Sequence, residues 1–171
     1  MKKSIIVVLL LFLSSMGFAQ DKNGIVRLTS REIEENKRPQ AVAYNFIMSI
    51  VEEKYSVTVD LMTENFFFQL MPYLFGDGIP ISQLFSSEYM HDIVEMRPVV
   101  KLGYDVVITN SHELDYSGDD NPYKGMDGYS VSFDCANAKG EIYDGSKGNY
   151  DTNARVMLVK KDDKWQVTGF K

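Results

Sequence analysis

ARVMLVKKDDKWQVTGF, residues 154–170, decides the fold, because two stretches of alternating side chains flank a charged turn. The stretch predicts a strand over Arg155–Lys161, a tight turn over Asp162–Lys164 and a last strand over Trp165–Phe170. Trp165 and Val167 fall on the same face of that last strand, so we expect both to pack on the rest of the protein. The chain therefore ends in a β-hairpin.

Two stretches upstream alternate in the same way. Residues 104–116 have one apolar and one more polar face, and residues 129–135 follow after the turn-rich loop SGDDNPYKGMDG. The predicted apolar face of the first stretch holds Tyr104, Val106, Ile108, Asn110, His112, Leu114 and Tyr116. We therefore expect an antiparallel meander with one polar face in the second half of the chain.

The first half has helical spacing. Pro39 suits the first turn of a helix that runs to Tyr55, with Val42, Phe46 and Ile50 in one apolar row. Three segments should follow: a short helix or irregular link over residues 56–62, a helix over 64–75 capped by Thr63 and kinked or shortened by Pro72, and a helix over 88–96 ended by Pro98.

The N-terminus has the three-part pattern of a secretory signal peptide. A basic start, MKKS, precedes the apolar run IIVVLLLFL, and Gly17 and Ala19 occupy the two positions that a signal peptidase reads. The run is shorter than the roughly 20 residues that span a bilayer, and Gln20 is not the cysteine that lipid attachment requires. We predict cleavage after Ala19 and a soluble, exported protein, periplasmic or extracellular, without membrane insertion.

The chain left after cleavage is acidic. The 18 basic residues less Lys2 and Lys3 leave 16, against 24 acidic residues, so the net charge is −8. Nucleic acids and anionic membranes attract clustered Lys and Arg, and we therefore expect neither as a partner. No motif in the chain indicates a cofactor.

We divide the remaining chain into a leader and one domain. Residues 20–37 are polar and of mixed charge, and we expect a leader that is ordered only in part. Residues 38–171 should form a single α+β domain, with N-terminal helices packed on a curved antiparallel β-sheet. Cys135 is the only cysteine, which excludes an intrachain disulfide. Its alternation with Phe133 predicts a buried, inert thiol.

The order of these elements resembles the nuclear transport factor 2-like superfamily, with its cystatin-like cone. Three features carry the resemblance: the opening helix PQAVAYNFIMSIVEEKYS with LMTENFFFQL, the long strands after residue 98, and the ending ARVMLVKKDDKWQVTGF. The resemblance covers residues 38–171 and extends to small secreted bacterial members of uncharacterised function. It implies a cone of helices backed by a bent sheet, with a homodimer through the open sheet face. The superfamily includes enzymes and binding modules, so the fold does not define the function.

His112 is the first candidate for chemistry, because it falls on the predicted apolar face near Asn110 and Tyr116. In a cone-shaped fold that face lines the cavity, where a histidine with a tyrosine could act as acid and base. The alternative is a histidine near a strand end that is hydrogen-bonded or partly exposed. Asp115 and Asp134 fall on the opposite face, unless a β-bulge reverses the count. The candidate pocket residues are His112, Asn110, Tyr104, Tyr116, Tyr129 and Cys135.

Two other patterns are weak metal signals. His91 lies on a predicted helix near Glu88 and Glu95, but zinc needs three or four ligands and the chain has only two histidines. The acidic loops over residues 119–127 and 144–153 do not fit the calcium-loop pattern. We interpret these patterns as a solvated helix face and ordinary turns, and we predict no metal.

Two functions remain open at this point. The first is an exported, non-catalytic domain that binds a small ligand or a protein partner. The second is a small lyase or isomerase that uses His112 with a tyrosine. An enclosed cavity with His112 beside a carboxylate would favour the enzyme, whereas His112 in open solvent would argue against it.

Overall fold

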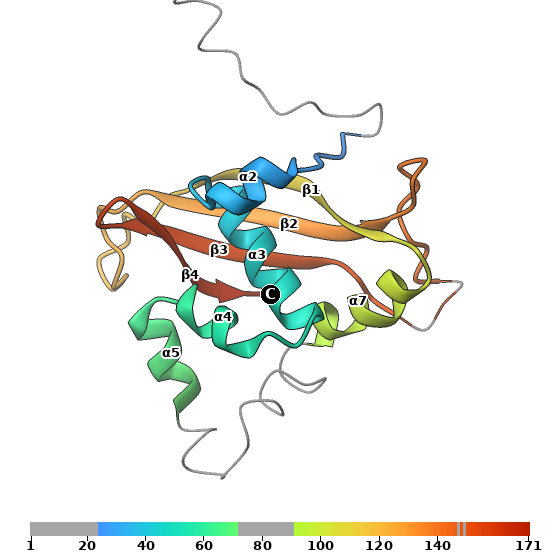
Figure 1. The fold of residues 1–171 in the computed structure, drawn as a ribbon. Helices are drawn as coiled ribbons and strands as arrows, with labels where there is room; N and C mark the ends of the chain where they lie inside the picture. The colour runs from blue at the N-terminus through green and yellow to red at the C-terminus, as the bar shows by residue number, and fades with distance from the viewer. Residues whose placement is uncertain (1–23, 72–90, 147, 149) are drawn as a thin grey trace, which may run out of the picture.

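The computed structural model describes residues 24–71, 91–146, 148 and 150–171 (Figure 1). The helices are α2 (Ser30–Glu35), α3 (Pro39–Val51), α4 (Tyr55–Asp60), α5 (Glu64–Met71) and α7 (His91–Lys101), and the strands are β1 (Asp105–Leu114), β2 (Gly128–Ala136), β3 (Ala154–Lys161) and β4 (Lys164–Phe170). The predicted α+β class with an antiparallel sheet is confirmed. The predicted signal peptide lies outside the described residues, and none of the helices within them has the length and apolar character needed to cross a membrane.

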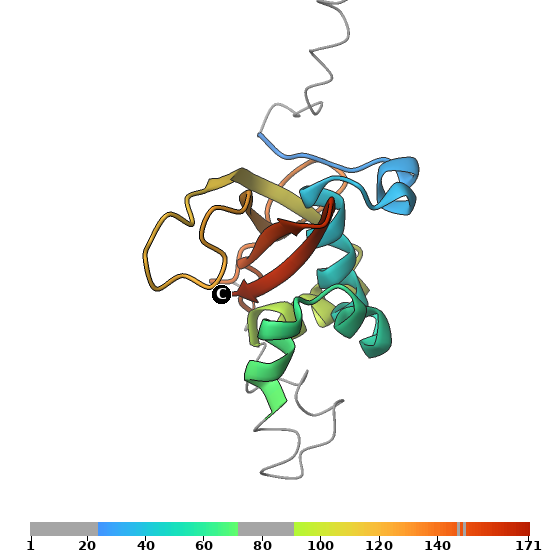
Figure 2. The ribbon, with the colours of Figure 1, turned by 90° about the vertical axis from the view of Figure 1, so that its left-hand side faces the viewer.

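The sheet is a meander in the order β1–β2–β3–β4, and all neighbouring strands are antiparallel. α3 crosses one face of this sheet, and the connection between β1 and β2 lies on the other side (Figures 1 and 2). Val42, Phe46 and Ile50 of α3 are buried in the core with the inward side chains of the strands. Phe46 also approaches Phe170 of β4, with ring centroids 6.3 Å apart. The predicted apolar row is therefore the sheet-facing side of the helix.

The helical prediction for residues 39–62 is correct in outline. Pro39 occupies the first turn of α3, as predicted, but the helix ends at Val51 rather than Tyr55. Glu53 then takes a positive φ of 61°, which breaks the helix before α4 begins. The segment left open as a short helix or a link is therefore a short helix.

Thr63 caps α5 as predicted. Its hydroxyl accepts a hydrogen bond from the Phe66 backbone N–H at 3.1 Å, which satisfies a donor that the first helical turn leaves unpaired. The effect of Pro72, the predicted helix end at residue 75 and the start of the next helix at residue 88 all lie outside the described residues.

Pro98 does not end the last helix, contrary to the prediction. α7 continues to Lys101, three residues beyond the proline. Proline removes one backbone donor and crowds the preceding turn, but Met96 and Val99 on either side of it are fully buried. Burial of Val99 in the core offsets this cost, and the chain leaves the helix at Gly103, where φ is 92°.

The alternation predicted for β1 is wrong beyond Ile108. An irregularity between Ile108 and Asn110 shifts the register, so that Ile108 pairs with Phe133 whereas Asn110 pairs with Ser132. Register partners share a face of the sheet, and an inserted residue turns every later side chain to the opposite face. Asn110 and His112 therefore lie on the face away from α3, while Phe133 lies in the core.

Residues 24–37 carry more structure than a partly ordered leader. α2 lies within them, and Thr29 and Glu32 form a capping box at its start. Val26 also pairs with Ile108 at the edge of β1. A local cap and one long-range edge contact hold this segment, and neither produces an apolar stripe that the sequence could reveal.

β3 and β4 form the predicted hairpin. Asp162 and Asp163 make the tight turn with φ values of 50° and 60°. Val167 is fully buried, but Trp165 on the same face is only partly buried, because it lies at the open end of the sheet. Both side chains therefore pack on the rest of the protein as expected, Val167 within the core and Trp165 against it with part of its surface exposed.

Candidate binding pocket

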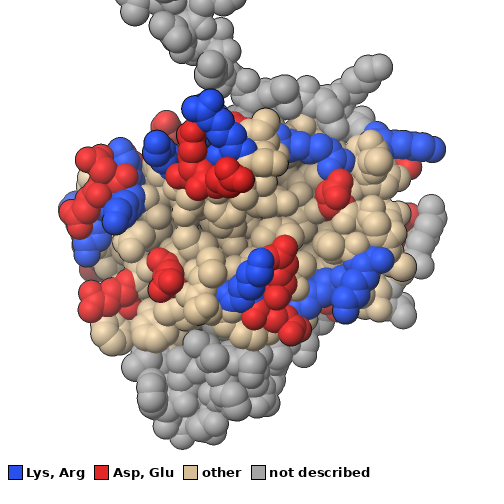
Figure 3. Space-filling view, in the orientation of Figure 1, with Lys and Arg blue, Asp and Glu red and all other residues tan. Residues whose placement is uncertain are grey.

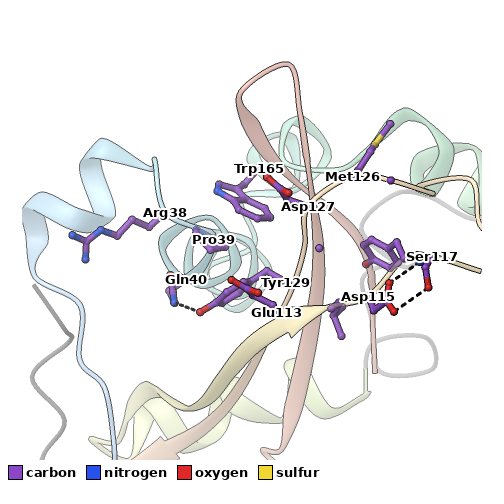
Figure 4. Close-up of a pocket in the computed structure, with 14 residues that line it drawn as sticks. Arg38, Pro39, Gln40, Glu113, Asp115, Ser117, Met126, Asp127, Tyr129 and Trp165 are labelled. Carbon is purple, nitrogen blue, oxygen red and sulfur yellow. Dashed lines mark hydrogen bonds between the residues drawn. The ribbon is translucent and has the colours of Figure 1, made fainter. Parts of the chain in front are cut away.

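A pocket opens at the end of the sheet where β1 ends and where β2 and β4 begin. Its volume is about 670 Å³, which lies within the range of small-molecule sites. The first turn of α3 forms one wall, and the connection between β1 and β2 forms another (Figure 4). The side chains that define its chemistry are Gln40, Glu113, Tyr116, Asp127, Tyr129 and Trp165.

The bulge in β1 turns Glu113 toward this pocket. Glu113 pairs with Tyr129, which precedes the inward residues Val131 and Phe133 at alternate positions of β2. On an unbroken alternation, Glu113 would lie on the opposite face of the sheet. The same irregularity that moves His112 away from the core side therefore supplies the pocket with a carboxylate.

A hydrogen bond ties the first turn of α3 to β2 at this pocket. Gln40 is buried, and its Nε2 donates to Tyr129 Oη at 2.9 Å and to Ser111 Oγ at 3.5 Å (Figure 4). Pro39 begins the helix just before Gln40 at no cost, because the first turn has no partner for its N–H. The amide holds the Tyr129 ring in place, and the tyrosine hydroxyl keeps its own proton to donate.

Trp165 and Tyr129 form an aromatic corner of the pocket. Their ring centroids lie 6.0 Å apart at an interplanar angle of 65°, an edge-to-face arrangement. Among the described residues, no acceptor takes a hydrogen bond from Trp165 Nε1. The corner thus presents aromatic surface together with an unused indole N–H.

The pocket is acidic. Glu113 and Asp127 line it, and in the described part of the chain neither carboxylate has a hydrogen bond or an ion pair. Arg38 is the basic residue of the lining, and its Nη1 lies 3.0 Å from Glu32 Oε1. The guanidinium charge is therefore already balanced by Glu32, whereas the two carboxylates are not balanced.

Charges on the helical face of the molecule behave differently. In Figure 3, many Lys and Arg side chains of this face lie beside Asp and Glu side chains, although some Asp and Glu side chains stand apart. The ion pairs that join them include Arg31–Glu35, Arg97–Glu53 and Lys160–Asp163. Glu113 and Asp127 of the pocket differ from the carboxylates of these ion pairs.

Tyr116 and Tyr129 are the two predicted pocket residues that line this pocket. The Tyr116 ring covers Gly128 so closely that a Cβ there would lie 2.6 Å from it. Its hydroxyl lies 3.4 Å from the Leu158 carbonyl oxygen and 3.3 Å from Thr168 Oγ1. Burial raises the pKa of Tyr116, so it serves as a neutral wall.

Asp115 also lines the pocket, although unbroken alternation placed it on the outward face. Asp115 lies just past the end of β1, where its neighbours Leu114 and Tyr116 also line the pocket, so strand alternation no longer decides its direction. Asp115 accepts hydrogen bonds from the Ser117 backbone N–H at 2.8 Å and from Ser117 Oγ at 2.9 Å. Unlike Glu113, this carboxylate is therefore already engaged in a local turn.

His112 and Asn110 do not reach the pocket. Both side chains are exposed, and their register partners are Ser130 and Ser132. Those serines alternate with the core residues of β2, so this pair of candidates faces away from the pocket. The side chain of His91 lies outside the described residues.

Tyr104 and Cys135 lie at the opposite end of the sheet. Tyr104 meets Tyr143 edge to face, with centroids 5.3 Å apart. Cys135 is fully buried, and burial together with the neighbouring Asp134 carboxylate raises the pKa of the thiol to about 12. A buried thiol that stays protonated is a poor nucleophile.

A second pocket, of about 550 Å³, lies at this end beside Asp134. Burial raises the pKa of Asp134, against the opposing effect of hydrogen bonds from Thr152 Oγ1 at 2.5 Å and from the Cys135 backbone N–H at 2.7 Å. Within the described residues, no group of three or more His, Cys, Asp or Glu side chains is placed to hold a metal ion. This pocket therefore offers a protonatable carboxyl without a ligand set for a metal.

Several pocket residues were not predicted from the sequence. Gln40 follows the helix-starting proline and gives no signal of its own, and strict alternation predicts Glu113 on the face opposite the one it takes. Trp165 was interpreted as a marker of the fold without a role at a site. A single tryptophan at the open end of the last strand was the one signal that could have indicated an aromatic binding surface.

No protein-family model matches the chain, and the comparison with curated proteins found no matching sequence.

Proposed function

We propose that this chain is an exported, non-catalytic domain of the nuclear transport factor 2-like type, and that it binds a small ligand or a side chain of a protein partner in the pocket beside Trp165. Export is supported by the signal-peptide pattern of residues 1–19. The family assignment is supported by the order of elements and by the crossing of α3 over a meander sheet.

One observation carries the binding function: the pocket combines open volume with polar groups that have no partner among the described residues. Trp165 Nε1 and the carboxylates of Glu113 and Asp127 all belong to its lining. Groups that form no bonds inside the protein are available to a ligand. The hydrogen bond from Gln40 to Tyr129 keeps the wall in shape before a ligand arrives.

The lyase or isomerase alternative receives no such support. It required His112 in a cavity with a tyrosine, and His112 is exposed on the other face of the sheet. Tyr116 and Tyr129 line the pocket, and the described residues of its lining include no histidine. A general base must lie within hydrogen-bonding reach of the proton that it removes.

The binding function can be tested with the chain's single tryptophan. Trp165 lines the pocket, so a ligand that enters should change its fluorescence in a saturable way. We would titrate the chain without residues 1–19 against a panel of amines, sugars, nucleosides and short peptides, and confirm each hit by calorimetry.

Two tyrosines provide a matched pair of variants. Tyr129→Ala should abolish the calorimetric signal, whereas Tyr143→Ala, which removes an equivalent ring at the opposite end of the sheet, should leave it intact. Circular dichroism would verify that both variants fold. Binding that survives Tyr129→Ala, or a panel without any saturable change, would contradict the proposed site.

A further inference from the structure

We propose that the pocket recognises an organic cation, a primary ammonium group that lies against the Trp165–Tyr129 corner and between the carboxylates of Glu113 and Asp127. This inference rests on the proposed binding function and names the chemical class of its ligand. It follows from three observations: the charge of the lining, its aromatic surface and the distribution of its unused hydrogen-bonding groups.

The charge of the lining favours a cation. Glu113 and Asp127 have no hydrogen bond or ion pair among the described residues, although both line the same 670 Å³ pocket. Arg38 does not neutralise them, because its guanidinium is paired with Glu32. Both carboxylates are exposed, and a bound cation would supply the missing charge in a concave site that focuses the attraction.

The aromatic corner favours an organic ammonium over a small hydrated metal ion. In an edge-to-face pair, one ring presents its edge to the face of the other, so the remaining ring faces can contact a ligand. Tryptophan and tyrosine faces attract ammonium groups, and tryptophan does so most strongly. The methylene groups next to the nitrogen would cover the apolar part of the same surface.

The unused hydrogen-bonding groups argue against other ligand classes. An anion would approach two unbalanced carboxylates, and the basic residue among the described lining residues, Arg38, already pairs with Glu32. An apolar ligand would cover those carboxylates without satisfying them, which is costly. A primary ammonium carries three donors, enough for both carboxylates and one further acceptor.

The ammonium group could belong to a free polyamine or to a lysine side chain of a peptide. We would therefore titrate the chain without residues 1–19 with spermidine and with trilysine, and follow Trp165 fluorescence and calorimetric heat. Trilysine with acetylated side chains and terminus keeps the shape and loses the charge. Saturable binding of either amine, with at least about tenfold weaker binding of the acetylated peptide, is the expected result, and the tighter of the two identifies the source.

Charge attraction to an acidic protein must be separated from binding in the pocket. Glu113→Gln removes one pocket carboxylate at constant shape, and Asp120→Asn removes an exposed carboxylate that does not line the pocket. We expect Glu113→Gln to weaken amine binding about tenfold and Asp120→Asn to change it by less than about twofold. Asp127→Asn should also weaken binding, and melting curves would verify the fold of each variant.

The outcomes separate this inference from the proposed function. Equal weakening by Glu113→Gln and Asp120→Asn would show general charge attraction and overturn the ammonium site. Binding of a sugar or nucleoside that Tyr129→Ala abolishes, with no response to either amine, would overturn the ligand class and leave the proposed function intact. If no ligand changes Trp165 fluorescence or gives calorimetric heat, both the ammonium site and the proposed binding function are overturned.

Discussion

Two edge-to-face aromatic pairs lie at opposite ends of the same sheet, and they have different surroundings. We call these regions the Tyr104 end and the Trp165 end. At the Tyr104 end, Tyr104 and Tyr143 meet beside the buried Cys135, and the Tyr143 backbone N–H bonds to the Cys135 carbonyl oxygen at 2.8 Å. At the Trp165 end, Trp165 and Tyr129 meet beside a pocket with unpaired carboxylates.

The contact geometry of an aromatic pair therefore does not reveal its role. Both pairs contribute apolar contact to the core. What distinguishes them is the nearby carboxylate: Asp134 accepts hydrogen bonds from Thr152 and Cys135, whereas Glu113 and Asp127 accept none among the described residues. A site is indicated where a rigid aromatic pair and unsatisfied polar groups meet in a concave region.

The largest expected effect on stability is a core substitution near the Tyr104 end. Phe133 is fully buried and pairs with Ile108 and Ala154. Phe133→Ala should lower the free energy of unfolding by about 3–5 kcal/mol, because it leaves a cavity in a packed core. Urea denaturation followed by circular dichroism measures this loss. A cost below about 1 kcal/mol would show that this part of the core is loosely packed.

Trp165→Ala should have a smaller effect on stability and a larger effect on binding. Trp165 is partly buried, so the cost should be about 1–2 kcal/mol rather than the value for a fully buried ring. Ligand binding, measured by calorimetry because the variant lacks tryptophan, should be lost. A destabilisation as large as that of Phe133→Ala would remove the contrast between the two ends.

Much of the fold could be predicted from the sequence, because its signals are local. The row of Val42, Phe46 and Ile50 predicted the helix on the sheet, and Thr63 predicted the start of α5. Alternation located the strands within a few residues. Pro98 misled the prediction, because burial of neighbouring side chains outweighed a local preference.

The site was harder to predict, because it depends on one irregularity and on distant contacts. The bulge after Ile108 arises from how β1 pairs with β2, and no residue type in β1 marks it. It placed Glu113 in the pocket and turned His112 outward. Gln40 reaches Tyr129 only because α3 crosses the sheet, which a pattern within one segment does not reveal.

The smallest expected effect concerns Asp134 and depends on pH. Burial raises the pKa of this carboxyl in the folded state above its ordinary value near 3.8, so the folded protein binds the proton more tightly than the unfolded chain. Protonated Asp134 makes its whole contribution to stability at a pH below the pKa of this group in the unfolded chain. The contribution is lost as the pH rises through the pKa of the group in the folded protein. Asp134→Asn keeps an oxygen acceptor for Thr152 and removes the charge.

The free energy of unfolding of the Asp134→Asn variant should therefore differ from that of the parent only at a pH where Asp134 of the folded parent is charged. At about pH 3, below the unfolded pKa, the variant and the parent should have the same free energy of unfolding. Near pH 7 the variant should be more stable, by less than about 1 kcal/mol because solvent screens a half-buried group. Urea denaturation at several pH values measures the difference, with Asp120→Asn as the exposed control. If the variant is instead less stable near pH 7, the hydrogen bonds from Thr152 and Cys135 to the charged Asp134 outweigh the cost of its burial. The Tyr104 end would then stabilise a charged carboxylate.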